Sequence, residues 1–247
     1  MSSNISPAII MRIKEFGESD LLVSFFTPDK GRLKGVAKGA RRSRRRFSNS
    51  LDLFCLTSLE YELKRGKDLH FLHSSRLLSG FPGIRSDFTS LSLASYMVEL
   101  TEILFPPLVP DRRMFDLLKD SFIRLNQGQS SRIIRIVFEA RAMALGGYAI
   151  HLEKCCNCRR PYTGEGRAVF IRSKGGISCL KCWQGSSLTR ELSPAAVKAI
   201  SIIQSGTWDT IEGLALTDEV IGEIRPVLAL HIEYRIGRRL KSAEYLD

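Results

Sequence analysis

Four cysteines stand in two closely spaced pairs that could together bind one ion. Twenty residues separate the two Cys-x2-Cys pairs, which consist of Cys155, Cys158, Cys179 and Cys182. Each pair can fold as a tight turn that directs two sulfurs to one point, and four thiolates in a tetrahedron suit Zn²⁺. Because four protein ligands leave no open coordination position, we expect one structural Zn²⁺ per chain and no catalytic metal.

The remaining cysteines and other thiol chemistries leave alternatives to this prediction. Cys156 lies inside the first pair and could replace Cys155 as a ligand, whereas Cys55 lies far away in a strand-like segment and should be buried. A redox dithiol pair, an iron–sulfur site and free buried cysteines are the competing interpretations. A disulfide framework is typical of short secreted chains, which a chain of 247 residues does not resemble.

A second cluster is strongly basic and could bind polyanions. Six of nine consecutive residues are Lys38, Arg41, Arg42, Arg44, Arg45 and Arg46. A loop with this much charge cannot lie in a core, and guanidinium groups fit phosphate oxygens. Arg32 and Lys34 precede the loop and extend the cluster. We predict that these eight residues contact nucleic-acid phosphates; the alternative is a merely solvated run.

The net charge of +11 is unevenly distributed along the chain. Residues 1–80 carry 15 basic and 8 acidic side chains, residues 151–190 carry 8 and 2, and residues 191–247 carry 6 and 9. Clustered positive charge favours a nucleic-acid partner, bound through phosphate contacts that release counterions. A basic surface that only aids solubility is the alternative, and the basic residues around the cysteines fit either interpretation.

Common catalytic motifs are absent from the sequence. It contains no P-loop, no dinucleotide-binding glycine motif after a strand, no His-Glu-x2-His and no Gly-x-Ser-x-Gly. The four histidines form no metal-binding pattern. We therefore predict a protein that is not an enzyme and has no catalytic residues, with a nuclease or a redox protein as the alternative.

Five short segments rich in strand-forming residues must position the basic loop. They are Ala8–Ile13, Leu21–Phe26, Arg32–Ala37, Leu56–Leu63 and Leu69–Leu72. Short strands joined by turns are typical of a small closed barrel of the OB type, with an SH3-like barrel as the competitor. In an OB barrel, the strand face and its loops form a groove for single-stranded nucleic acid.

Aromatic residues in this region could fill the barrel or stack on bases. They are Phe25, Phe26, Phe47, Phe54, Tyr61 and Phe71. We expect most of them in the core and at most one or two facing a ligand.

The rest of the chain has mainly helical periodicity. Helices are expected from Ser86 or Asp87 to about Phe105, from Asp111 to about Gln127, from Ser131 to Leu145, from Pro194 onward, and from Thr217 to about Ser242 with an interruption at Pro226. Between the cysteine pairs, Arg167–Ile171 and Gly175–Ile177 predict a small hairpin, as in a zinc ribbon.

These elements predict an α+β fold with two domains. Residues 1–80 should form a five-stranded OB-type barrel that binds nucleic acid, and residues 81–247 a helical domain. A zinc-ribbon-like four-cysteine module should be embedded in the helical domain at about residues 152–188. No run approaches the ~18 apolar residues of a membrane span, and the first ten residues lack the basic segment that opens a secretory signal. We expect a cytoplasmic protein without a membrane partner.

The order and spacing of several short motifs resemble those of the RecO family of bacterial DNA repair proteins. The motifs are Gly17–Leu22, Phe26–Thr27, Gly31–Leu33, Val36–Arg41, Phe138–Arg141, Gly146–Tyr148 and the first cysteine pair. The resemblance covers most of the chain and is weak after Trp183. Not every member of that family keeps the cysteines, so the zinc prediction depends on the spacing in this sequence.

The resemblance implies a recombination mediator that is associated with the nucleoid. Such proteins bind single- and double-stranded DNA and anneal complementary strands. They act with the partner RecR and with single-stranded-DNA-binding protein to help load the RecA recombinase. An RNA-binding or translation-associated module with an OB barrel and a zinc ribbon is the alternative function, and a purely structural interaction protein is another.

Overall fold

The computed structural model describes residues 3–64, 66, 68–183, 185 and 190–246. Contacts divide the chain into two compact units, one from Met1 to Gln129 and one from Ser130 to Tyr245, apart from the last two residues. Residues 184 and 186–188 of the predicted zinc module lie outside the described residues. No helix in the described ranges is both long enough and apolar enough to cross a membrane.

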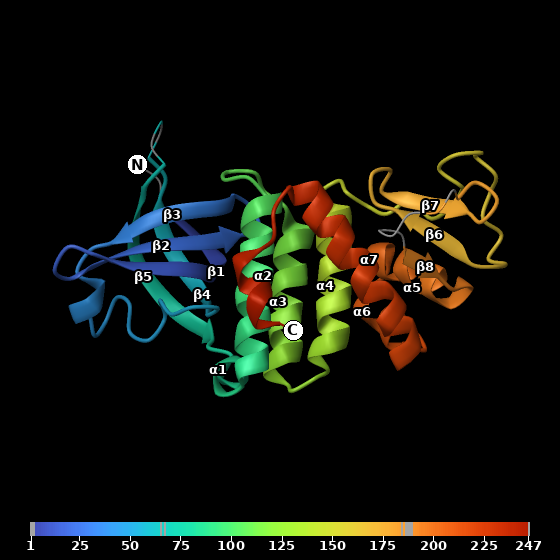
Figure 1. Ribbon diagram of the computed structural model, residues 1–247. Coiled ribbons are helices and arrows are strands. Elements are labelled where there is room, and N and C mark those ends of the chain that lie inside the picture. The colour runs from blue at the N-terminus through green and yellow to red at the C-terminus, as the bar shows by residue number, and fades with distance from the viewer. Residues whose placement is uncertain (1–2, 65, 67, 184, 186–189, 247) are drawn as a thin grey trace. The chain divides into compact units, whose positions relative to one another are not determined.

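Five strands of the first unit form a closed barrel in the order β1-β2-β3-β5-β4 (Figure 1). They are β1 (Ser3–Phe16), β2 (Asp20–Thr27), β3 (Gly31–Ala37), β4 (Leu56–Glu62) and β5 (His70–Ser79). Neighbouring strands pair antiparallel except β3 and β5, which pair parallel. The predicted α+β fold with an N-terminal barrel of the OB type is confirmed.

Two strands are much longer than predicted because each pairs with its two neighbours along largely different stretches. β1 pairs with β4 through Ser3–Ile9 and with β2 through Ile9–Phe16. β5 pairs with β3 through His70–Leu72 and with β4 through Phe71–Ser79. Barrel closure therefore draws polar residues at the strand ends into the ladders, although no hydrophobic alternation marks them.

The barrel interior receives side chains from the strands and from the basic loop. Phe25 and Tyr61 meet edge to face there, with their ring centroids 5.5 Å apart. Ala40, Phe47 and Leu51 of the loop after β3 join the same buried cluster. The loop is thus anchored on both sides of its arginines.

Three helices complete the first unit, and side-chain caps begin two of them where the sequence predicts. The helices are α1 (Pro82–Ser86), α2 (Phe88–Leu104) and α3 (Arg112–Asn126). The carboxylate of Asp87 accepts the N–H of Ser90 at 2.8 Å, and that of Asp111 accepts the N–H of Met114 at 2.9 Å. Each cap satisfies a backbone donor that the first helical turn leaves unpaired.

The helices cover one outer face of the barrel through aromatic contacts. Phe26 on β2 stacks on Phe115 of α3 at 6.3 Å between centroids. Phe54 meets Phe122 of the same helix edge to face at 5.6 Å. A second apolar core therefore lies between this face and α3.

The second unit combines helices with a small three-stranded sheet. Its elements are α4 (Ser131–Leu145), β6 (Ala168–Ile171), β7 (Gly176–Cys179), β8 (Arg190–Leu192), α5 (Pro194–Ser205), α6 (Trp208–Glu212) and α7 (Asp218–Ile236). The sheet has the order β7-β6-β8, and α4 packs against α5 and α7 (Figure 1). The hairpin predicted between the cysteine pairs is confirmed, whereas β8 adds a strand that was not predicted.

α7 continues through Pro226, so the predicted interruption is wrong. A proline inside a helix removes a backbone hydrogen bond and costs about 3 kcal/mol. The helix persists because its neighbours Ile224, Val227 and Leu228 are completely buried. It ends earlier than predicted, at Gly237, whose φ of 75° is left-handed.

Gly31 begins β3 and generates a prediction about stability. Its φ is 68°, and a Cβ at this position would overlap the carbonyl oxygen of Val109. Gly31→Ala should therefore lower the free energy of unfolding by more than the ~1–2 kcal/mol that left-handed backbone alone costs. Urea unfolding measures this loss. Gly17→Ala is the control, since its φ is 63° and its surroundings are open; equal losses in both variants would contradict the prediction.

Candidate functional site: a four-cysteine centre and a basic barrel surface

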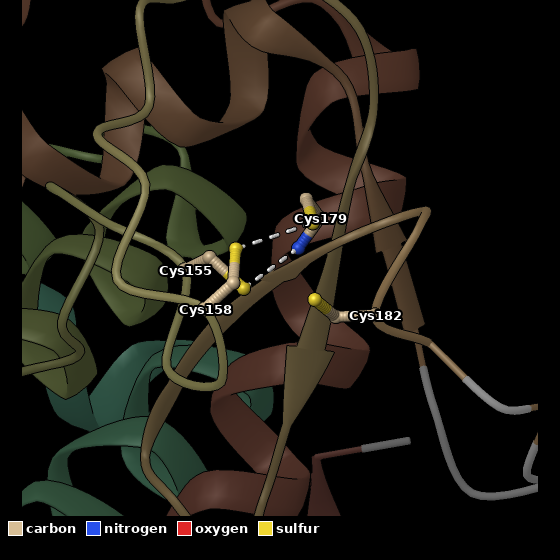
Figure 2. A group of neighbouring side chains, drawn as sticks. All are labelled: Cys155, Cys158, Cys179 and Cys182. Atoms are coloured by element: carbon tan, nitrogen blue, oxygen red, sulfur yellow. Dashed lines mark hydrogen bonds between the residues drawn. The ribbon is translucent and has the colours of Figure 1, made fainter.

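The structure brings four cysteine sulfurs of the second unit together. The Sγ atoms of Cys155, Cys158, Cys179 and Cys182 all lie within 4.8 Å of one another (Figure 2). Those of Cys158 and Cys179 are 3.9 Å apart. A tetrahedral ion with metal–sulfur bonds of ~2.3 Å requires sulfurs about 3.8 Å apart. The cluster therefore has the dimensions to hold one metal ion.

Two backbone turns direct these sulfurs toward one point. In the first turn, the N–H of Arg159 donates to the carbonyl of Cys155 at 3.0 Å, and Arg159 has a left-handed φ of 63°. In the second turn, Cys179 ends β7 and its carbonyl accepts the N–H of Cys182 at 3.0 Å. Each pair of cysteines is thus positioned by its own turn, and the fold of the module brings the two pairs together.

Cys155 is the most buried of the four cysteines. Its Sγ accepts the backbone N–H of Cys179 at 3.4 Å (Figure 2). Desolvation raises the pKa of Cys155, but N–H groups of Cys179, Cys158 and Asn157 lower it more strongly, to about 5. Because the thiolate is the form that binds a metal, Cys155 is ready to act as a ligand at neutral pH.

The remaining cysteines behave differently from Cys155. Hydrogen bonds to the sulfurs of Cys179 and Cys158 raise the pKa of Cys182, so a bound cation would replace its proton. Cys156 stands outside the sulfur cluster, and its N–H donates to the carbonyl of Ile177 at 2.8 Å. Cys55 is 2% exposed in the barrel core, which confirms the expectation that it is buried.

Basic side chains in or beside the cysteine turns are exposed, and the cluster itself can account for them. They are Lys154, Arg159, Arg160 and Lys181. Four thiolates around a divalent ion carry a formal charge of about −2, which nearby cations offset. The charge surplus of residues 151–190 therefore has an explanation that requires no nucleic acid.

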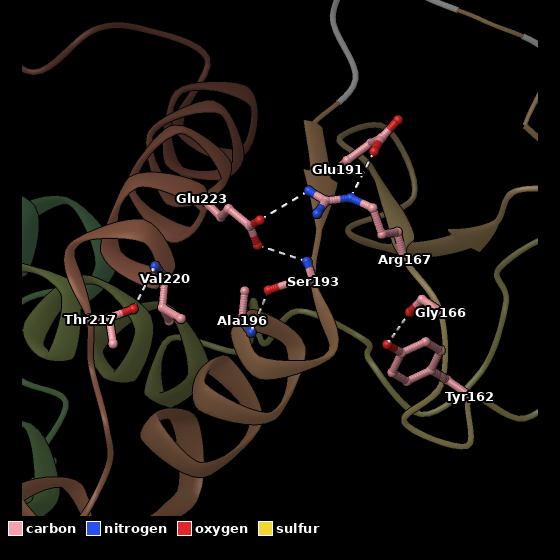
Figure 3. Close-up of polar contacts among 9 residues, drawn as sticks. All are labelled: Tyr162, Gly166, Arg167, Glu191, Ser193, Ala196, Thr217, Val220 and Glu223. Carbon is pink, nitrogen blue, oxygen red and sulfur yellow. Dashed lines mark hydrogen bonds and ion pairs between the residues drawn. The ribbon is translucent and has the colours of Figure 1, made fainter.

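Glu223 and Arg167 connect the cysteine module to the helices of the second unit (Figure 3). Arg167 pairs with Glu191 on β8 at 2.8 Å and with Glu223 on α7 at 3.0 Å. The other carboxylate oxygen of Glu223 accepts the N–H of Ser193, the cap of α5, at 2.7 Å. Desolvation raises the pKa of Glu223, but hydrogen bonds from Ser193 and Arg167 lower it overall.

The predicted arginine loop is exposed on the barrel, and its arginines divide into two groups. Arg42, Arg44 and Arg45 are exposed and form no ion pair within the described part of the chain. Arg41 pairs with Glu15 at 3.1 Å. The guanidinium of Arg46 donates to the carbonyl of Lys38 at 2.8 Å. Three arginines are therefore available to a ligand, whereas two also hold the loop in place.

The other predicted contacts lie on β3 or directly after it and do not form one cluster. Lys34 on β3 and Lys38, which directly follows the strand, are both exposed. Arg32 lies six residues before Lys38, a separation of about 20 Å for extended backbone. Its carbonyl accepts the N–H of Leu108 at 3.0 Å, and its Nε is buried without a hydrogen-bond partner among the described residues.

One aromatic residue differs from the other candidates in exposure. The buried ones are Phe25, Phe26, Phe47, Phe54 and Tyr61, as expected for core residues. Phe71 on β5 is only partly buried, and the Nζ of Lys64 lies 3.7 Å from its ring centroid. Lys64 is absent from the predicted contacts. Its position just after a strand-like segment is a weak signal, because only the pairing register places it beside Phe71.

Two family models together match nearly the whole chain. The model described as Recombination protein O N terminal matches residues 1–81, and the one described as Recombination protein O C terminal matches residues 85–244. The chain belongs to the RecO family. This membership confirms the resemblance of the sequence motifs and places the chain among proteins of DNA repair and recombination.

Full-length relatives of the RecO family agree with the family models. The DNA repair protein RecO of Syntrophus aciditrophicus is 31% identical over 241 residues, which cover 96% of this chain and 93% of that protein. The DNA repair protein RecO of Geobacter metallireducens is 35% identical over 204 residues, covering 81% and 82%. That of Dehalococcoides mccartyi is 28% identical over 240 residues, covering 97% and 93%.

Removing the charge of Glu223 should lower the free energy of unfolding of the second unit. Glu223→Gln breaks the pair with Arg167 and should cost about 1–3 kcal/mol at neutral pH, because the partly buried N–H of Ser193 and the guanidinium lose a charged acceptor. The lowered pKa of Glu223 means that its contribution is complete above the unfolded-state pKa. The difference between wild type and variant should therefore shrink as the pH falls through the folded-state pKa.

Denaturant unfolding at several pH values measures the effect. Glu191→Gln is the matched control, since Glu191 binds the same Arg167 but its side chain is 45% exposed, against 15% for Glu223. An exposed pair contributes at most about 1 kcal/mol. A loss as large in Glu191→Gln, or one independent of pH, would contradict the assignment.

Proposed function

We propose that this RecO family protein is a non-enzymatic recombination mediator in DNA repair. It binds single- and double-stranded DNA through the barrel, anneals complementary strands, and works with RecR and single-stranded-DNA-binding protein to help load RecA. It acts in the cytoplasm, in association with the nucleoid. Family membership supports the assignment to DNA repair. The observation that carries DNA binding is the exposed arginine loop, which the barrel core anchors on both sides.

The arginine loop supplies contacts to the sugar-phosphate backbone. Arg42, Arg44 and Arg45 are the principal contacts, since their guanidinium groups are exposed and unpaired within the described part of the chain. Arg41 and Arg46 contribute charge while holding the loop. A strand that follows β3 would meet Lys38, Lys34 and then Arg32. Contacts of this kind carry little sequence preference.

Phosphate contacts also explain how strands could anneal without nucleotide hydrolysis. Two complementary strands repel each other through their phosphates, and bound cationic side chains reduce that repulsion. The energy for annealing then comes from base pairing, and the protein supplies only proximity and charge. In this mechanism the chain needs no catalytic residue.

The four-cysteine centre is proposed to hold one structural Zn²⁺. Sulfur spacing and the backbone hydrogen bond to Cys155 support this assignment. When bound, the ion would crosslink the two turns and use all four thiolates, so it would not bind a substrate. Its contribution is to the stability of the second unit, because a metal held by preformed ligands binds the folded state alone.

Shortening one pair of arginines tests the DNA-binding surface. Arg44→Ala/Arg45→Ala should weaken binding to all DNA sequences and make the salt slope less steep by about 1.4, from about −3 for four single-strand contacts. Fluorescence anisotropy with labelled oligonucleotides measures both. The control is Arg112→Ala/Arg113→Ala on α3, which removes the same charge from side chains that are 78% and 77% exposed.

Three outcomes would contradict the proposal. Equal changes in both double variants would show a general charge effect instead of a loop contact. A preference for RNA in competition with single-stranded DNA of equal length would favour the RNA-binding alternative. Annealing of complementary strands that required ATP would rule out the nucleotide-independent mechanism.

Metal analysis tests the zinc centre independently of DNA. The purified protein should contain about one Zn²⁺ per chain, and Cys158→Ala or Cys179→Ala should lose it and lower the thermal midpoint. Cys156→Ala is the matched control and should keep the metal, because Cys156 lies outside the sulfur cluster. Loss of zinc in the control, or its retention in Cys158→Ala, would refute the proposed ligand set.

A further inference from the structure

A second binding feature lies on the barrel surface beside the arginine loop. We propose that Phe71 is a stacking platform for one unpaired base, and that Lys38 and Lys64 bind the phosphates flanking that base. This inference rests on the proposed DNA binding of the barrel and adds a feature that phosphate contacts alone cannot provide, selectivity for single strands.

An apolar row crosses three adjacent strands on the outer face of the barrel. Leu22 on β2 pairs with Val36 on β3, and Val36 pairs with Phe71 on β5. The residues that follow each of these in sequence fill the barrel interior. Because side chains alternate along a strand, the row itself projects outward. Leu22 and Phe71 are partly exposed, and Val36 forms the buried floor between them.

Two lysines from different segments converge on the ring of Phe71. The Nζ of Lys64 lies 3.7 Å from the ring centroid and that of Lys38 lies 5.4 Å from it. Each lysine is held by its backbone: the N–H of Lys64 donates to Nδ1 of His70 at 3.2 Å, and the carbonyl of Lys38 accepts from Arg46 at 2.8 Å. Burial lowers the pKa of His70 and so favours the neutral ring, whose Nδ1 can accept this hydrogen bond.

The two ammonium groups lie over the ring of Phe71, where a base could stack instead. An ammonium group over an exposed aromatic ring is attracted only weakly, whereas stacking of a base on an aromatic side chain is stronger and tolerates any sequence. Once displaced, each ammonium remains within reach of the phosphates on either side of the base, and a phosphate carries a full charge. Binding of a strand therefore exchanges a cation–π contact for stacking plus ion pairs.

The surroundings of the platform define the path of the strand. Phe71 pairs with Glu62 on its β4 side, and the Glu62 carboxylate lies 3.5 Å from Nε2 of His73. This negative charge disfavours phosphates on β4. On the β3 side, Lys34 on the strand and Lys38 directly after it are exposed. The strand should thus follow β3 and continue toward the arginine loop.

Base pairing makes the platform selective. A base in a duplex is stacked on both faces by its neighbours and cannot lie on Phe71 without being unpaired. Stacking on the ring is therefore available to single strands, while the arginine loop serves both forms of DNA. Removing the aromatic ring should therefore lower the affinity for single-stranded DNA and leave the affinity for duplex DNA unchanged.

Phe71→Leu is the test, because leucine stays apolar but has no π-face. Affinity for a single-stranded oligothymidine should fall roughly tenfold, within the range measured for loss of one base–aromatic stack. Affinity for a duplex of equal length and the salt slope should not change. Phe71→Trp should keep the affinity and add tryptophan fluorescence that a bound base quenches. Phe88→Leu, on a residue that is 67% exposed on α2, is the matched control and should change neither affinity.

Lysine variants test the second half of the proposal. Lys64→Gln should make the single-strand salt slope less steep by about 0.7, the value of one phosphate contact, and leave the quenching of Phe71→Trp intact. Wild-type affinity in Phe71→Leu would overturn the inference. So would an equal loss of single-strand and duplex binding in a Phe71→Leu protein with an unchanged unfolding midpoint. A wild-type protein that binds neither DNA form would refute the proposed function itself.

Discussion

Closure of the barrel is the constraint on which the first unit depends. β1 and β5 each pair with their two neighbours along different stretches, and the chain must cross from β3 to β4 by a long loop. Backbone hydrogen bonds fix this crossing: the N–H of Ser75 donates to the carbonyl of Arg46 at 2.7 Å, and the N–H of Ile10 to that of Cys55 at 2.9 Å. With Phe47 in the barrel core, the charged residues between the anchors have no place except the surface.

The two basic regions of the chain have different physical meanings in the structure. On the barrel, the exposed guanidinium groups of Arg42, Arg44 and Arg45 form no ion pair within the described residues, so their charge is available to a polyanion. Around the cysteines, the cations lie next to four sulfurs that would carry negative charge in a metal complex. The net charge of +11 therefore does not describe one binding surface. On the barrel, the described residues offer no comparable cluster of negative groups to account for the charge of Arg42, Arg44 and Arg45.

In a DNA mediator, phosphate contacts and base stacking would provide different properties. In the proposed mechanism, the arginine loop would bind DNA of any sequence, and the ring of Phe71 would add a preference for unpaired bases without reading their identity. A protein that promotes annealing needs both properties, since it must hold strands of any sequence and release them once they pair. Stacking on Phe71 would be lost when the base pairs with the complementary strand, so the affinity for the product duplex would be lower.

The sequence by itself determined the features that depend on local chemistry. Cysteine spacing predicts the four-sulfur cluster, and the helix starts at Asp87, Asp111 and Pro194 follow from capping residues within one turn. Only the tertiary structure decided the features that depend on strand pairing and packing between segments far apart in the sequence. Closure lengthens β1 and β5, burial carries α7 through Pro226, and strand register places Phe71 on the outer face of the barrel, where it is only partly buried. A residue's neighbours in space, and hence its exposure, are not encoded in its local segment.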